Sequence, residues 1–247
     1  MKREFMLNGN KGYDISCMEW PCEQECAVLL CLHGFAGDKY SSVIQALADE
    51  LISKSIRVVT FDWPGHGKSP VDGKSLTIEN CMLDMDAVIQ EIRTANQPVY
   101  LFATSFGGFV GLNYLALHPS AFSKVVLRSP ALDMPNTFRS FLSDEDIQVL
   151  EKDGTVNIGF DRPLQLGKSF MDDLIQHRLR QDEYPAEVPG LIIQGDMDDV
   201  VDPQDSVKFA EKNGMKLHMI KGADHRYKNP GNLEEILSVT VPFLLGR

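Results

Sequence analysis

The sequence predicts a domain of the α/β class, with a mostly parallel central sheet and helices on both of its faces. Short apolar segments of strand length alternate along the chain with amphipathic segments of helical periodicity, and we find no internal repeat. The chain has 247 residues, of which 43% are hydrophobic and 24% are charged, an ordinary composition for a folded protein. This length suits one α/β domain that carries an insertion.

The periodicity of the apolar residues assigns each element. After an N-terminal ribbon, the expected strands cover residues 26–32, 57–61, 99–103, 124–128, 190–194 and 216–220. The expected helices cover residues 41–54, 78–95, 107–117, 204–213 and 233–245. Strands and helices therefore follow one another in the order that parallel sheets require.

The alternation stops between residues 131 and 187, where no strand–helix unit is recognisable. Ser143, followed by three acidic residues, is typical of a helix N-terminus, and this helix should end near Lys152. A loop rich in glycine and proline should follow, and then a polar helix around residues 171–180. We interpret residues 131–187 as a cap inserted into a core formed by residues 1–130 and 188–247. A large loop packed beside the core is the alternative.

Charge and cysteine content argue against several classes of function. The formal charge of −11 speaks against nucleic-acid binding, which needs clustered Lys and Arg. The five cysteines are an odd number, and Cys22 and Cys26 lack the C-x-x-C spacing of zinc or redox motifs, so we expect no metal. The N-terminal residues do not resemble a signal peptide, and no apolar run reaches the ~18 residues of a membrane span. We expect a cytoplasmic protein.

The candidate nucleophile is Ser105, within Ala103-Thr104-Ser105-Phe106-Gly107. A strand, a tight turn and a helix form the context that a nucleophile elbow requires. A serine at such a sharp turn crowds the positions two before and two after it, and Ala103 and Gly107 supply small residues there. The structural alternative is a serine that only caps the following helix.

His225 is the candidate base. A serine hydroxyl is a weak nucleophile until an imidazole accepts its proton. His225 lies in a glycine-containing loop after the last strand, and this loop returns to the carboxyl edge of the sheet, where Ser105 is expected. The remaining histidines have structural interpretations in turns, helices or a strand, and they are His33, His66, His118, His177 and His218.

The candidate acids cluster after the strand 190–194, and they are Asp196, Asp198, Asp199 and Asp202. The acid must hold the imidazole in the right tautomer and balance its charge. We choose Asp198 because it falls three residues after Gly195, where the loop should turn back. Asp196, Asp199 and Asp133, which follows the strand 124–128, stay open as alternatives.

A tetrahedral intermediate needs two backbone N–H groups directed at its oxygen. Phe106, the residue after the nucleophile, should supply one, and Phe35 in the loop after the first central strand should supply the other. Gly34 allows the backbone to turn close to the site, although an ordinary glycine-rich turn would look the same. Aromatic residues of the inserted segment are expected to line a substrate pocket or to pack locally, and they are Phe138, Phe141, Phe160 and Phe170.

These pieces, in the order Ser, Asp, His, resemble the α/β-hydrolase superfamily over about residues 27–245. Within it, the sequence is similar to small bacterial carboxylesterases of the cinnamoyl or feruloyl esterase type. The matching segments are His33-Gly34-Phe35, Phe61-Asp62, Gly65-His66-Gly67-Lys68-Ser69, residues 76–80, the turn at Ser105 and Gly222-Ala223-Asp224-His225. The resemblance implies a Ser105–Asp198–His225 triad, an oxyanion hole of Phe35 and Phe106, a cap over the acyl or aromatic group, and no cofactor.

The sequence differs from those esterases at two places, and other hydrolases also resemble it. Those esterases usually carry Gly-His where Ala103-Thr104 stands and Gln where Phe106 stands, and Phe106 should make the pocket floor more apolar. The segments Ala103-Thr104-Ser105 and Asp224-His225-Arg226 also resemble acyl-protein thioesterase-like hydrolases. We predict a serine hydrolase that cleaves a small-molecule carboxylic ester, hydroxycinnamoyl or other. Thioesterase, serine peptidase and non-catalytic ligand-binding protein are the alternatives, and the oligomeric state is left open.

Overall fold

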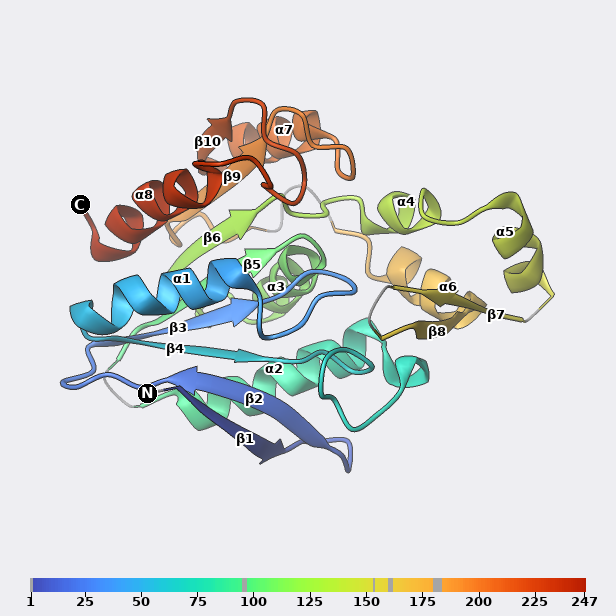
Figure 1. Ribbon diagram of the computed structural model, residues 1–247, viewed down its shortest axis with the longest axis horizontal. Helices are drawn as coiled ribbons and strands as arrows, with labels where there is room; N and C mark the ends of the chain where they lie inside the picture. The colour runs from blue at the N-terminus through green and yellow to red at the C-terminus, as the bar shows by residue number, and fades with distance from the viewer. Residues whose placement is uncertain (1, 95–96, 153, 160–161, 180–183) are drawn as a thin grey trace.

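The centre of the protein is a twisted sheet (Figure 1). The structure is a computed structural model, and it describes residues 2–94, 97–152, 154–159, 162–179 and 184–247. The order of its eight strands within these residues is β1-β2-β4-β3-β5-β6-β9-β10. Antiparallel pairing joins β1 to β2 and β2 to β4, and the other neighbours run parallel. The strands are β1 (Arg3–Asn8), β2 (Asp14–Trp20), β3 (Ala27–Leu32), β4 (Ile56–Phe61), β5 (Val99–Thr104), β6 (Lys124–Arg128), β9 (Gly190–Gly195) and β10 (Lys216–Ile220). The predicted fold class is confirmed.

Helices cover both faces of the sheet (Figure 1). One face carries α1 (Ser42–Leu51) and α8 (Asn232–Leu245), and the other carries α2 (Ile78–Ile92), α3 (Phe106–Leu117) and α7 (Pro203–Asn213). Short 3-10 helices cover Ile52–Lys54 and Gly73–Ser75. Among the helices formed by the described residues, none has the length and apolar character needed to cross a membrane.

The central strands are apolar along their whole length because helices bury both of their faces. In β3, alternate side chains enter two separate cores, with Val28, Leu30 and Leu32 facing α2 and α3. Ala27, Leu29 and Cys31 face α1 and α8. The alternation follows from the twofold repeat of a strand, and it explains why the sequence shows continuous apolar runs at these positions.

The segment between β6 and β9 is more ordered than the sequence predicts. It contains α4 (Met134–Arg139), α5 (Asp144–Glu151) and α6 (Lys168–Gln176), together with a hairpin of β7 (Thr155–Ile158) and β8 (Leu164–Gly167). The expected loop is therefore partly wrong: each hairpin strand has only four residues, too few for their alternation to stand out. The predicted start of α5 is confirmed, because Ser143 and Asp146 form a reciprocal capping box. The second helix begins at Lys168 rather than at residue 171.

The hairpin is fastened to the core through the guanidinium of Arg162. Its Nη1 donates to the carbonyl oxygens of His66, Gly67 and Ser69 at 2.8–3.2 Å, and its Nη2 donates to that of Val71 at 2.7 Å. A planar fork with several donors suits such a cluster of carbonyls. The segment thus lies beyond the carboxyl ends of the central strands, on the right of Figure 1.

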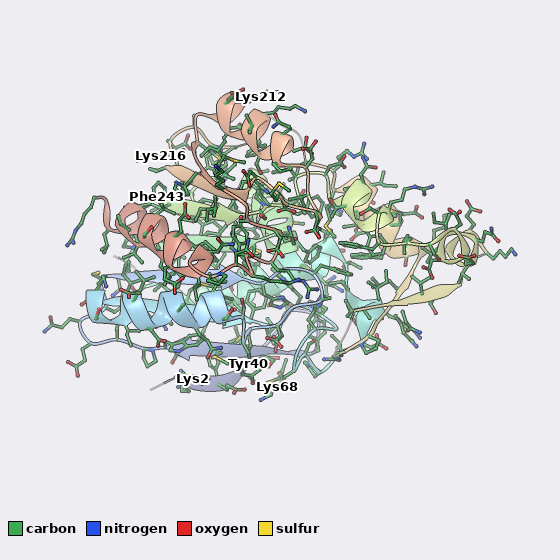
Figure 2. All side chains as sticks on the ribbon, turned by 45° about the horizontal axis from the view of Figure 1, so that its top comes forward. Lys2, Tyr40, Lys68, Lys212, Lys216 and Phe243 are labelled. Carbon is green, nitrogen blue, oxygen red and sulfur yellow. The ribbon has the colours of Figure 1, made fainter. Side chains whose placement is uncertain are left out.

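Charged side chains occupy both edges of the sheet (Figure 2). At the β1 edge, the Lys68 ammonium lies 5.1 Å from the ring centroid of Tyr40, and both side chains donate hydrogen bonds to Glu4. At the β10 edge, the Lys216 ammonium lies 5.8 Å from the ring centroid of Phe243. Lysines at sheet edges disfavour pairing with the strands of other molecules.

One buried carboxyl group on α2 makes the stability of the fold depend on pH. Asp84 is 1% exposed, and Tyr13 donates a hydrogen bond to it at 3.3 Å. Burial raises the pKa of Asp84 to about 7, and the bond from Tyr13 opposes this only in part. The pKa of Asp84 is thus higher in the folded protein than in the unfolded chain. Between these two pKa values, the folded state binds the proton more tightly than the unfolded state, so the free energy of unfolding falls as pH rises.

We therefore expect Asp84→Asn to stabilise the protein at pH 8 by about 1–3 kcal/mol, because the variant never buries a charge there. At pH 4.5 the gain should largely vanish, since the wild-type carboxyl group is then neutral. Urea unfolding at both pH values measures the difference. Asp86→Asn, at a partly exposed position of the same helix, is the matched control. A loss of stability in Asp84→Asn that is equal at both pH values would contradict the prediction.

Candidate active site

The predicted functional residues lie on loops at the carboxyl edge of the sheet. Ser105 follows β5, the segment 33–41 follows β3, the segment 196–202 follows β9, and the segment 221–231 follows β10. In parallel sheets, ligands bind at this edge because the loops of neighbouring strands meet there.

Ser105 has a backbone conformation that a residue with a side chain rarely adopts, with φ of 51° and ψ of −114°. Its N–H donates to the carbonyl oxygen of Arg128 at 3.0 Å, which fixes the turn to β6. A Cβ at Gly107 would lie 2.7 Å from the carbonyl oxygen of His33, so only glycine fits there. The methyl group of Ala103 is fully buried. Such strain costs of the order of 1–3 kcal/mol, which the surrounding packing must offset.

A chain of hydrogen bonds links the three residues that the sequence predicts as nucleophile, base and acid. The Nε2 atom of His225 lies 3.0 Å from Ser105 Oγ, and its Nδ1 atom lies 2.9 Å and 3.0 Å from the two carboxylate oxygens of Asp198. The Asp198 side chain is fully buried and that of His225 is 14% exposed. With Nδ1 protonated toward the carboxylate, Nε2 is free to accept the Ser105 proton.

The other candidate acids have different surroundings. Asp133 lies 3.7 Å from the guanidinium of Arg178 and accepts a hydrogen bond from Asn136. The carboxylate of Asp196 accepts the N–H of Gly222. The structure therefore brings Asp198, the acid chosen from the sequence, to the imidazole of His225.

The Asp198 carboxylate is held by donors on both of its oxygens. The N–H groups of Val200 and Val201 donate to Oδ1, each at 3.0 Å. Ser129 Oγ and Gln194 Nε2 donate to Oδ2 at 2.7 Å and 2.9 Å. These contacts fix the plane of the carboxylate, and with it the plane of the imidazole.

The same donors keep Asp198 ionised in a buried position. Burial alone would raise its pKa, but the hydrogen bond and charge of His225, with donation from Val201 and Ser129, hold the pKa below its usual range. The contacts of Ser129 and Gln194 with Asp198 were not predicted from the sequence. Their positions at the ends of β6 and β9, next to the expected acid, were the available signal.

The loop after β3 lies against Ser105. A Cβ at Gly34 would be 3.3 Å from Ser105 Cβ, so glycine allows this approach. The N–H of Ala36 donates to His66 Nε2 at 3.1 Å, while His66 Nδ1 lies 3.0 Å from the carbonyl oxygen of Pro64. Burial lowers the pKa of His66 to about 3, so the imidazole stays neutral and can accept this bond. His66, assigned only to a turn from sequence, supports the segment that carries Phe35.

A buried ion pair fastens the same loop to the turn after β4. Lys39 Nζ lies 2.6 Å from Asp62 Oδ2, and both side chains are fully buried. Asp62 also accepts the N–H groups of Lys39 at 2.8 Å and Lys68 at 2.9 Å, and Lys39 Nζ donates to Ser16 Oγ at 2.8 Å. The pair is thus surrounded by the hydrogen bonds that a buried charge pair requires.

Two cavities meet at Ser105 and His225. One has a volume of about 330 Å³ and a mostly apolar wall that includes Phe35, Met134 and Ile158. The other has a volume of about 490 Å³ and is polar, with Thr104 and Arg128 in its wall. Among the described residues, no cluster of three or more His, Cys, Asp or Glu side chains is arranged to hold a metal ion.

The predicted aromatic residues take different positions. Phe141 lines the apolar cavity, whereas Phe138 and Phe170 are buried behind Phe35, with ring centroids 5.9 Å and 6.1 Å from its ring. Phe160 lies outside the described residues. The Phe106 ring is fully buried in the core, so the expected apolar floor comes from Phe35 rather than from Phe106. The N–H of Phe106 begins α3, where helical N–H groups lack partners within the helix.

Known proteins resemble the chain in sequence and in fold. The hydrolase family described as "Serine aminopeptidase, S33" matches residues 23–152. Proline iminopeptidase PfmaB of Pestalotiopsis fici is 28% identical over 44% of this chain, which spans 38% of that protein's length. Human palmitoyl-protein thioesterase ABHD10 is 23% identical over 84% of the chain and 70% of its own length. Est1E from Butyrivibrio proteoclasticus, in a structure with bound ferulic acid, superposes with a TM-score of 0.84 at 22% identity, covering 98% of both chains.

The fold and the arrangement at the edge of the sheet define the class: this protein is an α/β-hydrolase. Within that class, the chain belongs to the family described as "Serine aminopeptidase, S33", because that family matches more than half of its residues. The fold is shared with Est1E, and the relatives include lipases, a peptidase and thioesterases. The chain thus belongs to a hydrolase family, and it spans less than half the length of relatives such as PfmaB.

The buried pair of Lys39 and Asp62 gives a prediction for stability. Lys39→Met should lower the free energy of unfolding by about 3–5 kcal/mol, because it leaves the Asp62 carboxylate buried without its cation. Lys68→Met is the matched control, since its ammonium is exposed and pairs with Glu4 at 3.0 Å. In urea unfolding at pH 7, that control should lose much less stability, because solvent screens an exposed ion pair. Equal losses in the two variants would contradict the importance of the buried pair.

Proposed function

We propose that the protein is a serine carboxylic ester hydrolase that uses Ser105 as nucleophile, His225 as general base and acid, and Asp198 to orient and balance the imidazole. One observation carries this proposal. Hydrogen bonds of 2.9 Å and 3.0 Å run from Asp198 through His225 to the Oγ of a serine held in a strained turn. This arrangement activates a hydroxyl group that would otherwise be a weak nucleophile.

The first half of the reaction acylates the enzyme. Ser105 Oγ attacks the carbonyl carbon of the ester while its proton moves to His225 Nε2. The carbonyl oxygen becomes negative and accepts hydrogen bonds from the N–H groups of Phe35 and Phe106, the proposed oxyanion hole. The intermediate then expels the alcohol, which takes the proton from His225, and an ester of Ser105 remains.

The second half removes the acyl group. A water molecule gives a proton to His225 Nε2 and attacks the carbonyl carbon of the acyl-enzyme. The second tetrahedral intermediate releases Ser105 Oγ, which recovers the proton, and a carboxylic acid leaves. Asp198 stays ionised throughout, in keeping with its lowered pKa.

The apolar cavity is the proposed acyl site. Its volume of about 330 Å³ suits a short acyl chain or one aromatic ring, and it opens at Ser105. In this proposal residues 131–187 are the cap, because Met134, Thr137, Phe141 and Ile158 form one of its walls. Hydroxycinnamoyl esters and other small-molecule acyl esters both fit this description.

A thioester is the second candidate substrate. The likeness to palmitoyl-protein thioesterase ABHD10 extends over 84% of this chain and favours it. An aminopeptidase would need a carboxylate to hold the ammonium group of its substrate. The polar cavity instead contains Arg128 and Arg226, and the carboxylate of Asp38 in its wall already accepts the N–H of Tyr40. These surroundings favour an ester or thioester over a peptide, and a complete hydrogen-bonded triad favours an enzyme over a non-catalytic binding protein.

A panel of substrates tests the proposal. Wild-type protein should hydrolyse at least one of short and long p-nitrophenyl esters, a methyl hydroxycinnamate and an acyl thioester. Ser105→Ala should lower kcat by roughly 10³-fold or more, because no other group replaces the nucleophile. Ser53→Ala, at an exposed serine, is the control and should keep full activity. Turnover that survives in Ser105→Ala would contradict the assignment, and turnover of peptides alone would favour the peptidase.

The pH profile gives a separate prediction. The kcat/KM of the wild type should fall in acid with the slope of a single proton, because a protonated His225 cannot accept the Ser105 proton. Asp198 should not contribute to this limb, since its pKa lies below its usual range and it stays ionised until stronger acid. Initial rates between about pH 4 and pH 9 measure the profile. A slope of two protons, or activity that rises in acid, would count against these roles.

A further inference from the structure

Arg128 is a buried cation beside the proposed nucleophile. It ends β6 and is 9% exposed. The register of the sheet sets it next to Thr104 of β5 and Ile193 of β9. Its side chain forms part of the wall of the polar cavity, together with Ser105 and His225. A substrate bound at Ser105 would therefore lie within reach of this guanidinium.

The guanidinium of Arg128 has few hydrogen-bond partners within the part of the protein that the structure describes. Its Nη2 donates to the carbonyl oxygen of Arg226 at 3.3 Å, and its Cζ lies 4.4 Å from the ring centroid of Tyr227. Its Nε has no hydrogen-bond partner among the described residues, and no carboxylate lies within ion-pair distance of it there. The charges of Asp198 and Asp224 favour this cation, although neither carboxylate is paired with it. A buried charge without a contacting carboxylate is costly, and its place in the wall of a cavity allows an anionic group of a ligand to pair with it.

The surroundings of Arg128 continue as a groove that contains further cations. An adjoining cavity of about 340 Å³ shares Arg128 and Arg226 and adds Lys228. Both cavities also touch Ser42 and Val43, the first residues of α1. This helix has no acidic residue in its first turn and no side-chain cap, so its positive dipole end faces the groove.

Acidic residues near the groove offset part of this positive charge. Asp38 accepts the N–H of Tyr40 at 2.8 Å. Asp224 accepts the N–H of Lys228 at 3.0 Å, and its carboxylate lies 3.8 Å from the Lys228 ammonium group. Glu234 lies in the wall of the adjoining cavity, on α8 and away from the wall that contains Ser105. In a chain with a formal charge of −11, a cluster of cations beside the nucleophile is a local exception.

We propose that this groove, with Arg128 at its base, binds an anionic group on the alcohol half of the ester, while the apolar cavity takes the acyl half. The inference rests on the proposed function and names its substrate class: esters of an apolar acid with an alcohol that carries a carboxylate or a phosphate. The planar guanidinium suits either anion, because it can donate two parallel hydrogen bonds.

Matched substrates test the preference. The three substrates share a butanoyl group and differ in the alcohol, which is glycerol, glycerate or glycerol 3-phosphate. Wild-type kcat/KM should be at least about tenfold higher for one of the two anionic esters than for the glycerol ester. The preferred member decides between carboxylate and phosphate. A preference for the neutral ester would overturn the proposal.

Variants at Arg128 test whether this residue causes the preference for anionic esters. Arg128→Met, which keeps the aliphatic stem on Tyr227, should lower the ratio of anionic to neutral kcat/KM by about tenfold or more, mainly through KM. Arg128→Lys should keep part of the preference, because the charge remains. Arg247→Met removes one positive charge at the exposed C-terminus and should retain the wild-type ratio. An unchanged ratio in a folded Arg128→Met protein would overturn the role of this residue.

Binding without turnover separates the two proposals. In the Ser105→Ala background, calorimetry compares the dissociation constants of the preferred anionic ester and the glycerol ester. The anionic ester should bind about tenfold more tightly, and adding Arg128→Met should remove this difference. Selective binding without turnover in the wild type would uphold the anion site and reject the esterase. Turnover without selective binding would uphold the esterase and reject the anion site.

Discussion

The site depends on one strained turn, in which a residue with a side chain is held at a positive φ between β5 and α3. This turn brings Ser105 Oγ within 3.0 Å of His225 Nε2, and α3 begins at the next residue, Phe106. Packing and hydrogen bonds around the turn hold Ser105 in this backbone conformation. Gly107 packs against the carbonyl oxygens of Leu32 and His33, and Arg128 accepts the N–H of Ser105.

Three buried carboxyl groups show how the surroundings decide the charge. Asp198 and Asp62 each accept several hydrogen bonds and face an imidazole or an ammonium group. Asp84 has the phenol of Tyr13 as a donor, and burial raises its pKa to about 7. The first two hold segments that carry the site, where a fixed charge gives a fixed geometry. Asp84 lies on α2, and its burial costs stability at pH values where the carboxyl group would otherwise ionise.

The fold and the Ser–His–Asp chain could be predicted because local patterns encode them. Continuous apolar runs mark buried parallel strands, small residues flank the turn at Ser105, and the strand order carries His225 back to it. The catalytic roles of these residues stay predictions. The hairpin of β7 and β8 could not be predicted from the sequence, because its strands are short. Its contact with the core depends on Arg162, which binds carbonyl oxygens of residues more than 90 positions away in the chain.

Several residues of the site could not be predicted from the sequence, because they contact residues far away in the chain. The side chain of Ser129 contacts Asp198, 69 residues later in the chain, and that of Arg128 contacts the loop around Tyr227. Phe138 and Phe170 look like pocket residues in the sequence, yet they support Phe35 from behind. Sequence pattern indicates which element a residue occupies, whereas these contacts depend on how distant elements meet.

The central claim, that the turn and His225 together make Ser105 nucleophilic, is tested most directly by covalent labelling. The protein is treated with a fluorophosphonate, which reacts with activated serine hydroxyls, and the adduct is located by mass spectrometry. We predict one adduct, on Ser105, that forms at least about a hundredfold more slowly in His225→Asn. Labelling at another serine, or an unchanged rate in a folded His225→Asn protein, would contradict it.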